Sequence, residues 1–188
     1  MNIAIDIDDT LTESFDYFQP FVAEYFGVDL EYLQRRNISH SNFPEEWKAQ
    51  ELGFCKAYFD RYAADTPFKP DAPWGVEELR RNGHRIVIIT GRSDAFYTDP
   101  YKTTEAELRN GNIHYDKLIC TLDKGGACLA EKIDILIDDL PANCDAAAKI
   151  GVKTLLFESK ANKDLNTAYL PPCRDPFHHT LQTLRRPG

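Results

Sequence analysis

The chain has 188 residues and a formal net charge of −8 at pH 7. This length allows one sizeable core, or a core with a small insert, and the acidic balance disfavours a binder of nucleic-acid polymers, which needs a basic face. No apolar stretch is long enough to span a membrane, and Asp6, Asp8 and Asp9 interrupt the apolar segment that opens the chain. We therefore expect no signal peptide, no membrane partner and a cytoplasmic location.

The first predicted element is a strand in the opening sequence NIAIDIDDTLT. Its alternation places Ile3, Ile5 and Ile7 on one face, and Asp6 and Asp8 on the other. The two acids lie at the carboxyl end of the strand, where open parallel sheets bind ligands, so one could be a nucleophile and the other a proton carrier. The alternative is that Asp-Asp-Thr only caps the next helix. Asp6 lies before any cap position, and a buried carboxylate there is costly unless it is compensated.

Residues 13–71 interrupt the strand pattern. They contain two long helical patterns, at about 15–35 and 45–64. The chain has 22 aromatic residues (11 Phe, 9 Tyr and 2 Trp), and 14 of them lie in this segment. We expect a helical insert with a small core of its own.

The rest of the chain alternates between strand-like and helix-like segments. Short apolar runs predict four further strands, at 85–90, 117–121, 133–138 and 152–157. Amphipathic patterns that end at Asn-Gly or Gly predict three helices, at 74–81, 103–109 and 141–150. This alternation is typical of an α/β fold with a parallel sheet and helices on both faces.

The C-terminal segment, residues 159–188, is polar and rich in proline. We expect it to pack on the core or to be partly disordered, with one short helix near 180–186. The five cysteines contain no CxxC pair, so we expect reduced thiols rather than a disulfide framework or a structural zinc site. The five histidines show no metal-ligand spacing and are expected to be surface or core residues.

Four of the predicted strands are followed by polar residues that can meet at one edge of the sheet. These residues are Asp6, Asp8, Thr90, Gly91, Lys124, Asp138 and Asp139. Lys117 begins its predicted strand and Lys132 precedes the next one, so both belong at the opposite edge. Each motif alone has a simpler interpretation, with Lys124 as a solvated loop residue and Thr90-Gly91 as an ordinary turn. Their shared location at carboxyl ends is the argument for a site.

Charge supports the same hypothesis. Four aspartates brought together would repel one another, and a divalent cation would make the cluster tolerable. Oxygen ligands favour Mg²⁺, which also shares substrate phosphate oxygens. A phosphate could then be held by Lys124, the Thr90 hydroxyl and the Gly91 N–H, because glycine lets a ligand approach the backbone.

In order, DIDDTLT, ITGR, TLDK and LIDD resemble the four motifs of the haloacid dehalogenase superfamily of phosphohydrolases. The resemblance covers residues 1–12 and 72–158, which we expect to form the core, with 13–71 as the cap. The insert and the motif spacing are similar to those of the 5′(3′)-deoxyribonucleotidase family. The resemblance implies a Rossmann-like sheet of order 3-2-1-4-5, with the first strand central.

The resemblance also implies roles for the site residues. Asp6 would be the nucleophile that forms an aspartyl-phosphate, and Asp8 would protonate the leaving oxygen and then activate water. Mg²⁺ would be held by Asp6, the Asp8 backbone carbonyl and Asp138, with Asp139 orienting a metal-bound water or exchanging roles with Asp138. Arg92 departs from the nucleotidase pattern and receives no role. The walls of the substrate pocket are predicted to include Phe15, Phe18, Phe43 and Trp47.

These features predict a Mg²⁺-dependent phosphomonoesterase that acts on a small phosphomonoester, a nucleoside monophosphate. A phosphatase of the same chemistry with another substrate, such as a sugar phosphate, is the first alternative. A receiver-type module that accepts a phosphoryl group is disfavoured, because its acceptor aspartate lies on the third strand and no cap interrupts it. A degenerate, non-catalytic binder is disfavoured by the four intact motifs.

Overall fold

In the computed structural model, which describes residues 1–162, five parallel strands form one sheet in the order β3-β2-β1-β4-β5. The strands are β1 (Asn2–Ile5), β2 (Arg85–Thr90), β3 (Lys117–Cys120), β4 (Ile135–Asp138) and β5 (Lys153–Leu156). The predicted order is confirmed: β1 is central and pairs with β2 on one side and β4 on the other. The carboxyl end of β1 therefore lies between those of β2 and β4.

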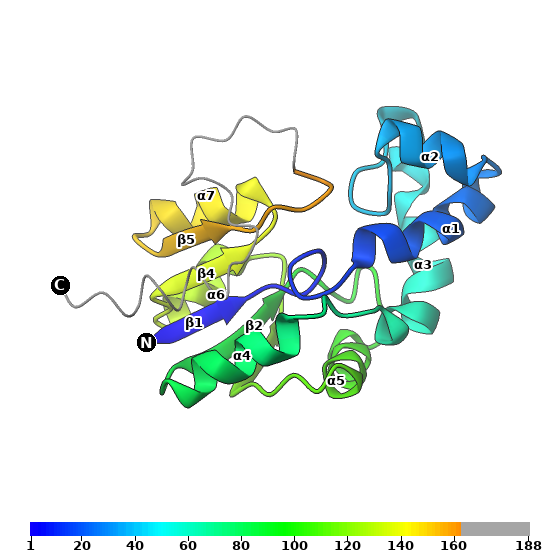
Figure 1. The fold of residues 1–188 in the computed structure, drawn as a ribbon. Helices are drawn as coiled ribbons and strands as arrows, with labels where there is room; N and C mark the ends of the chain where they lie inside the picture. Colours follow the sequence, from blue (N-terminus) through cyan, green and yellow to red (C-terminus); the bar gives the residue numbers. More distant parts are fainter. Residues whose placement is uncertain (163–188) are drawn as a thin grey trace.

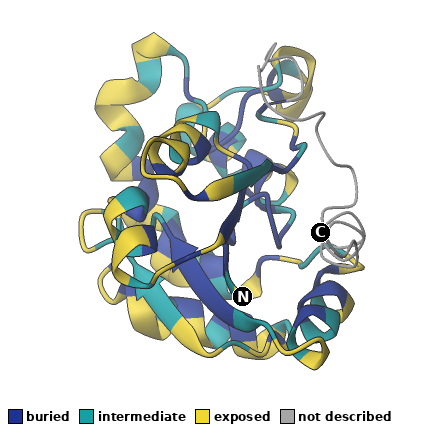
Figure 2. Cartoon of the chain, turned by 90° about the vertical axis from the view of Figure 1, so that its left-hand side faces the viewer, coloured by how far each residue is buried: buried dark blue, intermediate teal, exposed yellow. Residues whose placement is uncertain are grey.

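Helices cover both faces of the sheet, as the alternating pattern predicted. On one face, α4 (Ala72–Arg81) and α5 (Pro100–Asn110) bury Val76 and Leu108 in a cluster that includes Ile3, Ile5 and Ile7. On the other face, α6 (Lys124–Ala130) and α7 (Pro141–Lys149) cover a second cluster of buried side chains. Figure 2 shows the buried strands between helices whose outer surfaces are exposed.

The helix α6 was not predicted from the sequence. Two of its first three residues are Gly125 and Gly126, and glycine is among the poorest helix formers. The helix begins because the carboxylate of Asp123 accepts a hydrogen bond from the Gly126 N–H at 2.8 Å, as an N-cap does. Lys124 is therefore the first residue of a helix rather than a loop residue.

The insert is helical, but its first pattern forms two helices instead of one. They are α1 (Ser14–Phe26) and α2 (Leu30–Arg36). The break lies at Gly27, whose φ of 64° ends α1 in the left-handed conformation, with the Val28 N–H donating to the Ala23 carbonyl at 3.0 Å. The second pattern contains α3 (Glu51–Tyr62) between two short 3-10 helices, Glu45–Gln50 and Ala63–Asp65.

The aromatic residues of the insert pack against one another beyond the carboxyl ends of the strands (Figure 1). Phe26 and Trp47 stack with ring centroids 4.2 Å apart, and Phe43 meets Phe54 edge-on at 5.3 Å. Such contacts add to the large apolar area that aromatic side chains bury. We call this unit, residues 13–71, the cap, and its boundaries remain a prediction.

Several expectations concern residues that lie outside the described range, including the short helix near 180–186, the packing of residues 163–188 and the state of Cys173. Within residues 1–162, Cys55, Cys128 and Cys144 are free and buried, and Cys120 is free and half-buried. No helix in this range is long and apolar enough to cross a membrane.

Candidate active site

Asp6 directly follows β1 and is placed by the sheet. Its N–H donates to the Ile137 carbonyl at 3.0 Å, which extends the pairing with β4 by one residue. The chain then turns sharply, because the Ile7 carbonyl accepts hydrogen bonds from the N–H groups of Thr10, Leu11 and Thr12. The Asp6 side chain, buried at 4% exposure, lies at the carboxyl edge of the sheet.

Asp9 completes this turn in the left-handed conformation, with a φ of 59°. Its carboxylate accepts the Phe15 N–H at 2.6 Å and so caps α1, where the adjacent Glu13 makes no side-chain cap. Burial of Asp9 raises its pKa to about 7, so its charge is costly in the folded protein.

A pair of substitutions isolates this cap. Asp9→Asn keeps the acceptor oxygen and a residue type that tolerates the left-handed conformation, whereas Asp9→Ala loses both. We expect Asp9→Ala to be less stable than Asp9→Asn by about 1–2 kcal/mol in urea unfolding at pH 8. Equal stabilities of the two uncharged variants would contradict the capping role.

Lys124, the first residue of α6, contacts carboxylates at the ends of β1 and β4. Its Nζ lies 2.7 Å from the Asp6 Oδ1 and 2.7 Å from the Asp138 Oδ2, and its side chain is buried. Lys117 instead pairs with Glu131, which also binds Arg85 at the start of β2, and this places it at the opposite edge of the sheet. The structure thus brings Asp6 together with Lys124 and Asp138, which lie more than a hundred residues later in the chain.

The buried carboxylates around Lys124 outnumber its single positive charge. Oxygens of Asp6, Asp138 and Asp139 lie within 4.8 Å of one another. Burial, and to a smaller extent repulsion by neighbouring aspartates, raises the pKa of Asp6 to about 7, although the charge of Lys124 opposes this shift. Burial and the nearby Asp9 also raise the pKa of Asp139. All-oxygen donors with excess negative charge suit a divalent cation such as Mg²⁺, so these residues fit the predicted metal.

The two neighbouring acids of β4 differ in what they contact. The Asp138 carboxylate accepts hydrogen bonds from the Leu140 N–H at 2.9 Å and from the Asn143 side chain, in addition to Lys124. Asp139 lines the cavity described below. The family resemblance implies that Asp138 is the ligand and that Asp139 orients a metal-bound water, with an exchange of these roles left open. The geometry favours Asp139 as the residue that faces a bound cation.

Asp8 does not join this cluster through its side chain. Its carboxylate is bound by Arg92, with Nε–Oδ2 and Nη2–Oδ1 distances of 3.2 and 2.9 Å, and by the Ser14 hydroxyl at 3.0 Å. Burial alone would raise the pKa of Asp8, but Arg92 outweighs it and the pKa falls to about 2. With the side chain bound by Arg92 and Ser14, only the Asp8 backbone carbonyl is left for the predicted metal contact.

Thr90 and Gly91 are placed beside this centre by the end of β2. Thr90 is fully buried, and its hydroxyl has no hydrogen-bond partner among the described residues. Gly91 lines the cavity, and a Cβ added there would meet no atom within 4 Å. Neither packing nor a positive φ requires glycine at this position, which is consistent with a ligand that approaches the backbone.

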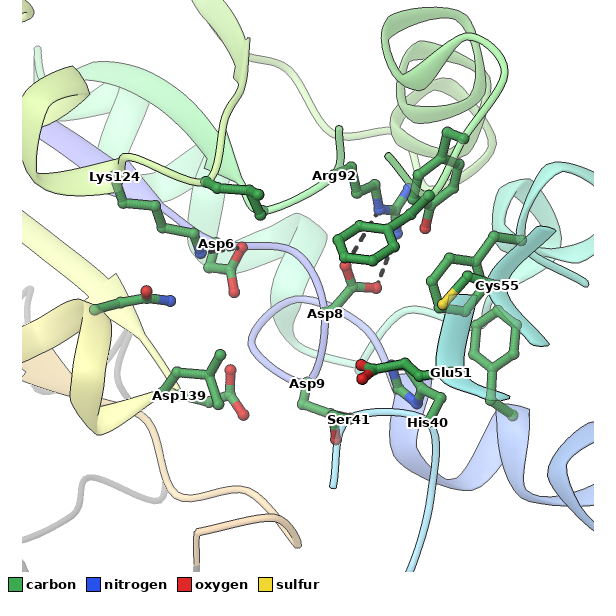
Figure 3. A pocket seen from close by; sticks show the side chains of 18 residues that line it. Asp6, Asp8, Asp9, His40, Ser41, Glu51, Cys55, Arg92, Lys124 and Asp139 are labelled. Atoms are coloured by element: carbon green, nitrogen blue, oxygen red, sulfur yellow. Dashed lines mark hydrogen bonds and ion pairs between the residues drawn. The ribbon is translucent and has the colours of Figure 1, made fainter. Parts of the chain in front are cut away.

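A cavity of about 250 Å³ lies between the strand ends and the cap (Figure 3). Asp6 and Lys124 border it on one side, and the cap residues His40, Glu51 and Cys55 border it on the other. Its aromatic lining consists of Phe18, Phe59, Phe96 and Tyr97. The cavity is thus polar and charged where the strands end, and largely aromatic toward the cap.

Of the four aromatic residues expected in the pocket, the structure places Phe18 in the lining. Phe43 and Trp47 do not line the cavity, because they pack against Phe26 within the cap. Phe15 is also buried away from it. The sequence did not identify three other aromatic residues of the lining, Phe59, Phe96 and Tyr97. Phe96 and Tyr97 could have been proposed as lining residues because they follow the ITGR motif at the end of β2.

His40, expected to be a surface or core histidine, is buried and lines the cavity. Burial, more than the positive charge of Arg92, lowers its pKa to about 4 from an ordinary value of 6.5, although Asp8 opposes this shift. Between pH 6.5 and pH 4, the histidine therefore binds a proton in the unfolded chain but stays neutral in the folded chain. Folding stability is lost as the pH falls from 6.5 to 4.

Replacing His40 with Gln should remove this acid sensitivity. Between pH 7 and pH 4, the free energy of unfolding of the wild type should fall by up to about 3 kcal/mol more than that of His40→Gln. Chemical unfolding at both pH values measures the difference. Parallel losses in the two proteins would show that His40 is not held neutral by the fold.

Comparison of the sequence with family models and with curated proteins gave no match. Among solved structures, the chain is similar to one described as a predicted phosphatase from Clostridium acetobutylicum, with 17% identity over 97% of this chain and 98% of that one and a TM-score of 0.67. It is also similar to a haloacid dehalogenase family hydrolase from Deinococcus radiodurans (14% identity; 97% and 95% covered; TM-score 0.62).

A third similar structure is a D,D-heptose 1,7-bisphosphate phosphatase from B. bronchiseptica, complexed with magnesium and phosphate (12% identity; 97% and 98% covered; TM-score 0.56). At these identities the likeness establishes the fold. With the parallel sheet of order 3-2-1-4-5, it defines this chain as an α/β protein with the Rossmann-like fold of haloacid dehalogenase phosphatases.

Proposed function

We propose that this protein is a member of the haloacid dehalogenase superfamily that hydrolyses phosphomonoesters through an aspartyl-phosphate on Asp6. The observation that carries the proposal is the meeting of Asp6, Lys124 and Asp138 at the carboxyl edge of the sheet, with Lys124 within 2.7 Å of both carboxylates. A lysine in that place holds a nucleophilic carboxylate in position and attracts the anionic phosphoryl group toward it.

Each residue has a chemical task in this proposal. An Asp6 oxygen attacks phosphorus while the bond to the leaving oxygen breaks, and Lys124, the Thr90 hydroxyl and the Gly91 N–H hold the phosphoryl oxygens. Asp8 donates a proton to the leaving oxygen and then accepts a proton from the attacking water. Hydrolysis of the acyl-phosphate regenerates Asp6 and releases inorganic phosphate. Catalysis of this kind is mainly positioning and charge neutralisation.

Asp6, Asp139 and the Asp8 backbone carbonyl would hold Mg²⁺, with Asp138 supporting them. The bound ion would neutralise charge on the transferring phosphoryl group. Its binding would also relieve the repulsion among the buried carboxylates, which Lys124 alone leaves uncompensated. The cap would exclude water from the cavity when substrate is bound.

The substrate we propose is a nucleoside monophosphate. The lining of the cavity includes the aromatic residues Phe18, Phe59, Phe96 and Tyr97. Phe59 and Tyr97 stack on each other at 5.1 Å, and a base could make further aromatic contacts with this part of the lining. A sugar phosphate would leave most of this apolar wall without a matching surface.

A screen of nucleoside monophosphates and sugar phosphates, with Mg²⁺ or with EDTA, tests the proposal. We expect nucleotides to be hydrolysed with the higher kcat/KM and only in the presence of Mg²⁺, and the Asp6→Asn variant controls for contaminating phosphatases. Much faster turnover of sugar phosphates would overturn the substrate assignment alone. Phosphate release that stops after one equivalent would indicate a phosphoryl-accepting module instead.

A further inference from the structure

Arg92 is a buried charged residue beside the site, and it has no part in the reaction proposed above. It lies two residues after β2, and its side chain is only 2% exposed. Burying a guanidinium is costly unless its charge is matched, and Arg92 lies between two carboxylates from different elements, Asp8 of the loop after β1 and Glu107 of α5.

Arg92 binds the Asp8 carboxylate in a bidentate manner. Nε and Nη2 of Arg92 each bind one oxygen of the Asp8 carboxylate, which fixes the plane of that group, and the Ser14 hydroxyl binds Oδ1 from another direction. Oδ2 receives only the longer 3.2 Å bond from Nε. The Asp8 side chain remains 31% exposed and lines the cavity, so it can still accept a proton (Figure 3).

The opposite side of the guanidinium forms an ion pair with Glu107. The Arg92 Nη1 lies 2.5 Å from the Glu107 Oε2, and Glu107 is fully buried. The Tyr97 ring lies 5.6 Å from the guanidinium carbon. Both ends of the guanidinium therefore face protein carboxylates, although Nη1 makes no hydrogen bond among the described residues and Arg92 itself lines the cavity. The bidentate contact with Asp8 favours a residue that orients this carboxylate over one that binds substrate.

We propose that Arg92, itself anchored by Glu107, is a positioning residue that aims the Asp8 carboxylate at the water that hydrolyses the aspartyl-phosphate. This inference rests on the proposed function. In that step the water oxygen bonds to phosphorus, its proton passes to Asp8, and the bond between phosphorus and the Asp6 oxygen breaks. The products are inorganic phosphate and the free Asp6 carboxylate, so no further reactant is needed.

The test uses p-nitrophenyl phosphate with Mg²⁺, because p-nitrophenolate leaves without needing a proton. In Arg92→Lys, which keeps the charge but loses the fork, formation of the aspartyl-phosphate should remain fast while its hydrolysis slows by about 10²-fold. Rapid mixing should then show a burst of about one p-nitrophenol per active site, followed by slow turnover. A purely structural defect would lower the rate without producing a burst.

Arg85→Lys is the matched control, because Arg85 also lies at an end of β2 and pairs with a glutamate, but at the far edge of the sheet. It should behave as the wild type. Thermal unfolding checks the fold of each variant. If Arg92→Lys does not fold, Glu107→Gln replaces it and should give a smaller burst; turnover at the wild-type rate in Glu107→Gln would overturn the proposal.

A double variant settles whether Arg92 acts through Asp8. In the Asp8→Asn background, adding Arg92→Lys should cost about twofold at most. A further loss of about tenfold or more would mean that Arg92 acts on the phosphoryl group directly, and would overturn the inference. A wild-type protein that releases no phosphate from any phosphomonoester would instead refute the proposed function, independently of Arg92.

Discussion

Replacing Asp6 with Asn should abolish phosphate release, with a loss in kcat of about 10⁴-fold or more. An amide oxygen is a far weaker nucleophile than a carboxylate, and no other described carboxylate lies within 2.7 Å of Lys124 except Asp138, which its own hydrogen bonds hold. Steady-state phosphate release measures the effect, with Asp145→Asn, an exposed residue of α7, as the control.

The same substitution should leave the fold intact. Burial raises the pKa of Asp6 in the folded protein to about 7. Protonated Asp6 therefore stabilises the folded state at low pH, and this stabilisation is lost as the pH rises through 7. Asn carries no charge, and Lys124 keeps Asp138 as its partner. In metal-free buffer at pH 8, Asp6→Asn should therefore unfold at the wild-type temperature or above it. An active Asp6→Asn enzyme would contradict the assigned nucleophile.

Removing divalent metal should have the second largest effect. EDTA should lower the rate by about 10³-fold or more, because the buried acid cluster then faces the phosphoryl group with only Lys124 to offset it. Added Mg²⁺ should restore the rate. Activity assayed against free Mg²⁺ concentration checks the prediction, and full activity after exhaustive chelation would contradict it.

Metal binding also has a readout that does not need activity. At about a hundredfold excess over the dissociation constant, Mg²⁺ should raise the melting temperature by about 5–10 °C. Asp139→Asn should lose most of this rise, because it removes the carboxylate that faces the cavity, whereas Asp145→Asn should keep it. An unchanged response of Asp139→Asn would place the ion elsewhere.

The sheet could be predicted from the sequence because buried parallel strands are short apolar runs, and each predicted run contains a strand. The polar residues that follow these runs were identifiable for the same reason, since parallel strands carry them to one edge. The helix α6 was missed because local propensity at Gly125 and Gly126 argues against it, while the cap from Asp123 favours it.

Other features depend on contacts that the sequence pattern does not encode. Which aromatic residues of the cap face the cavity depends on how α1 and α3 pack, so Phe43 and Trp47 were not distinguishable from Phe59. The pairing of Arg92 with Glu107 joins a loop to a helix, and a glutamate on an amphipathic helix is ordinarily solvated. Only the three-dimensional structure shows that Glu107 is buried.

Chemical trapping of the intermediate is the most direct test of the account. The enzyme is mixed with substrate and Mg²⁺, quenched in acid and treated with borohydride, which reduces an aspartyl-phosphate to homoserine. Peptide mass mapping should find homoserine at position 6 and nowhere else, and none when substrate is omitted. Homoserine at another aspartate, or none in an enzyme that is turning over, would contradict the central claim.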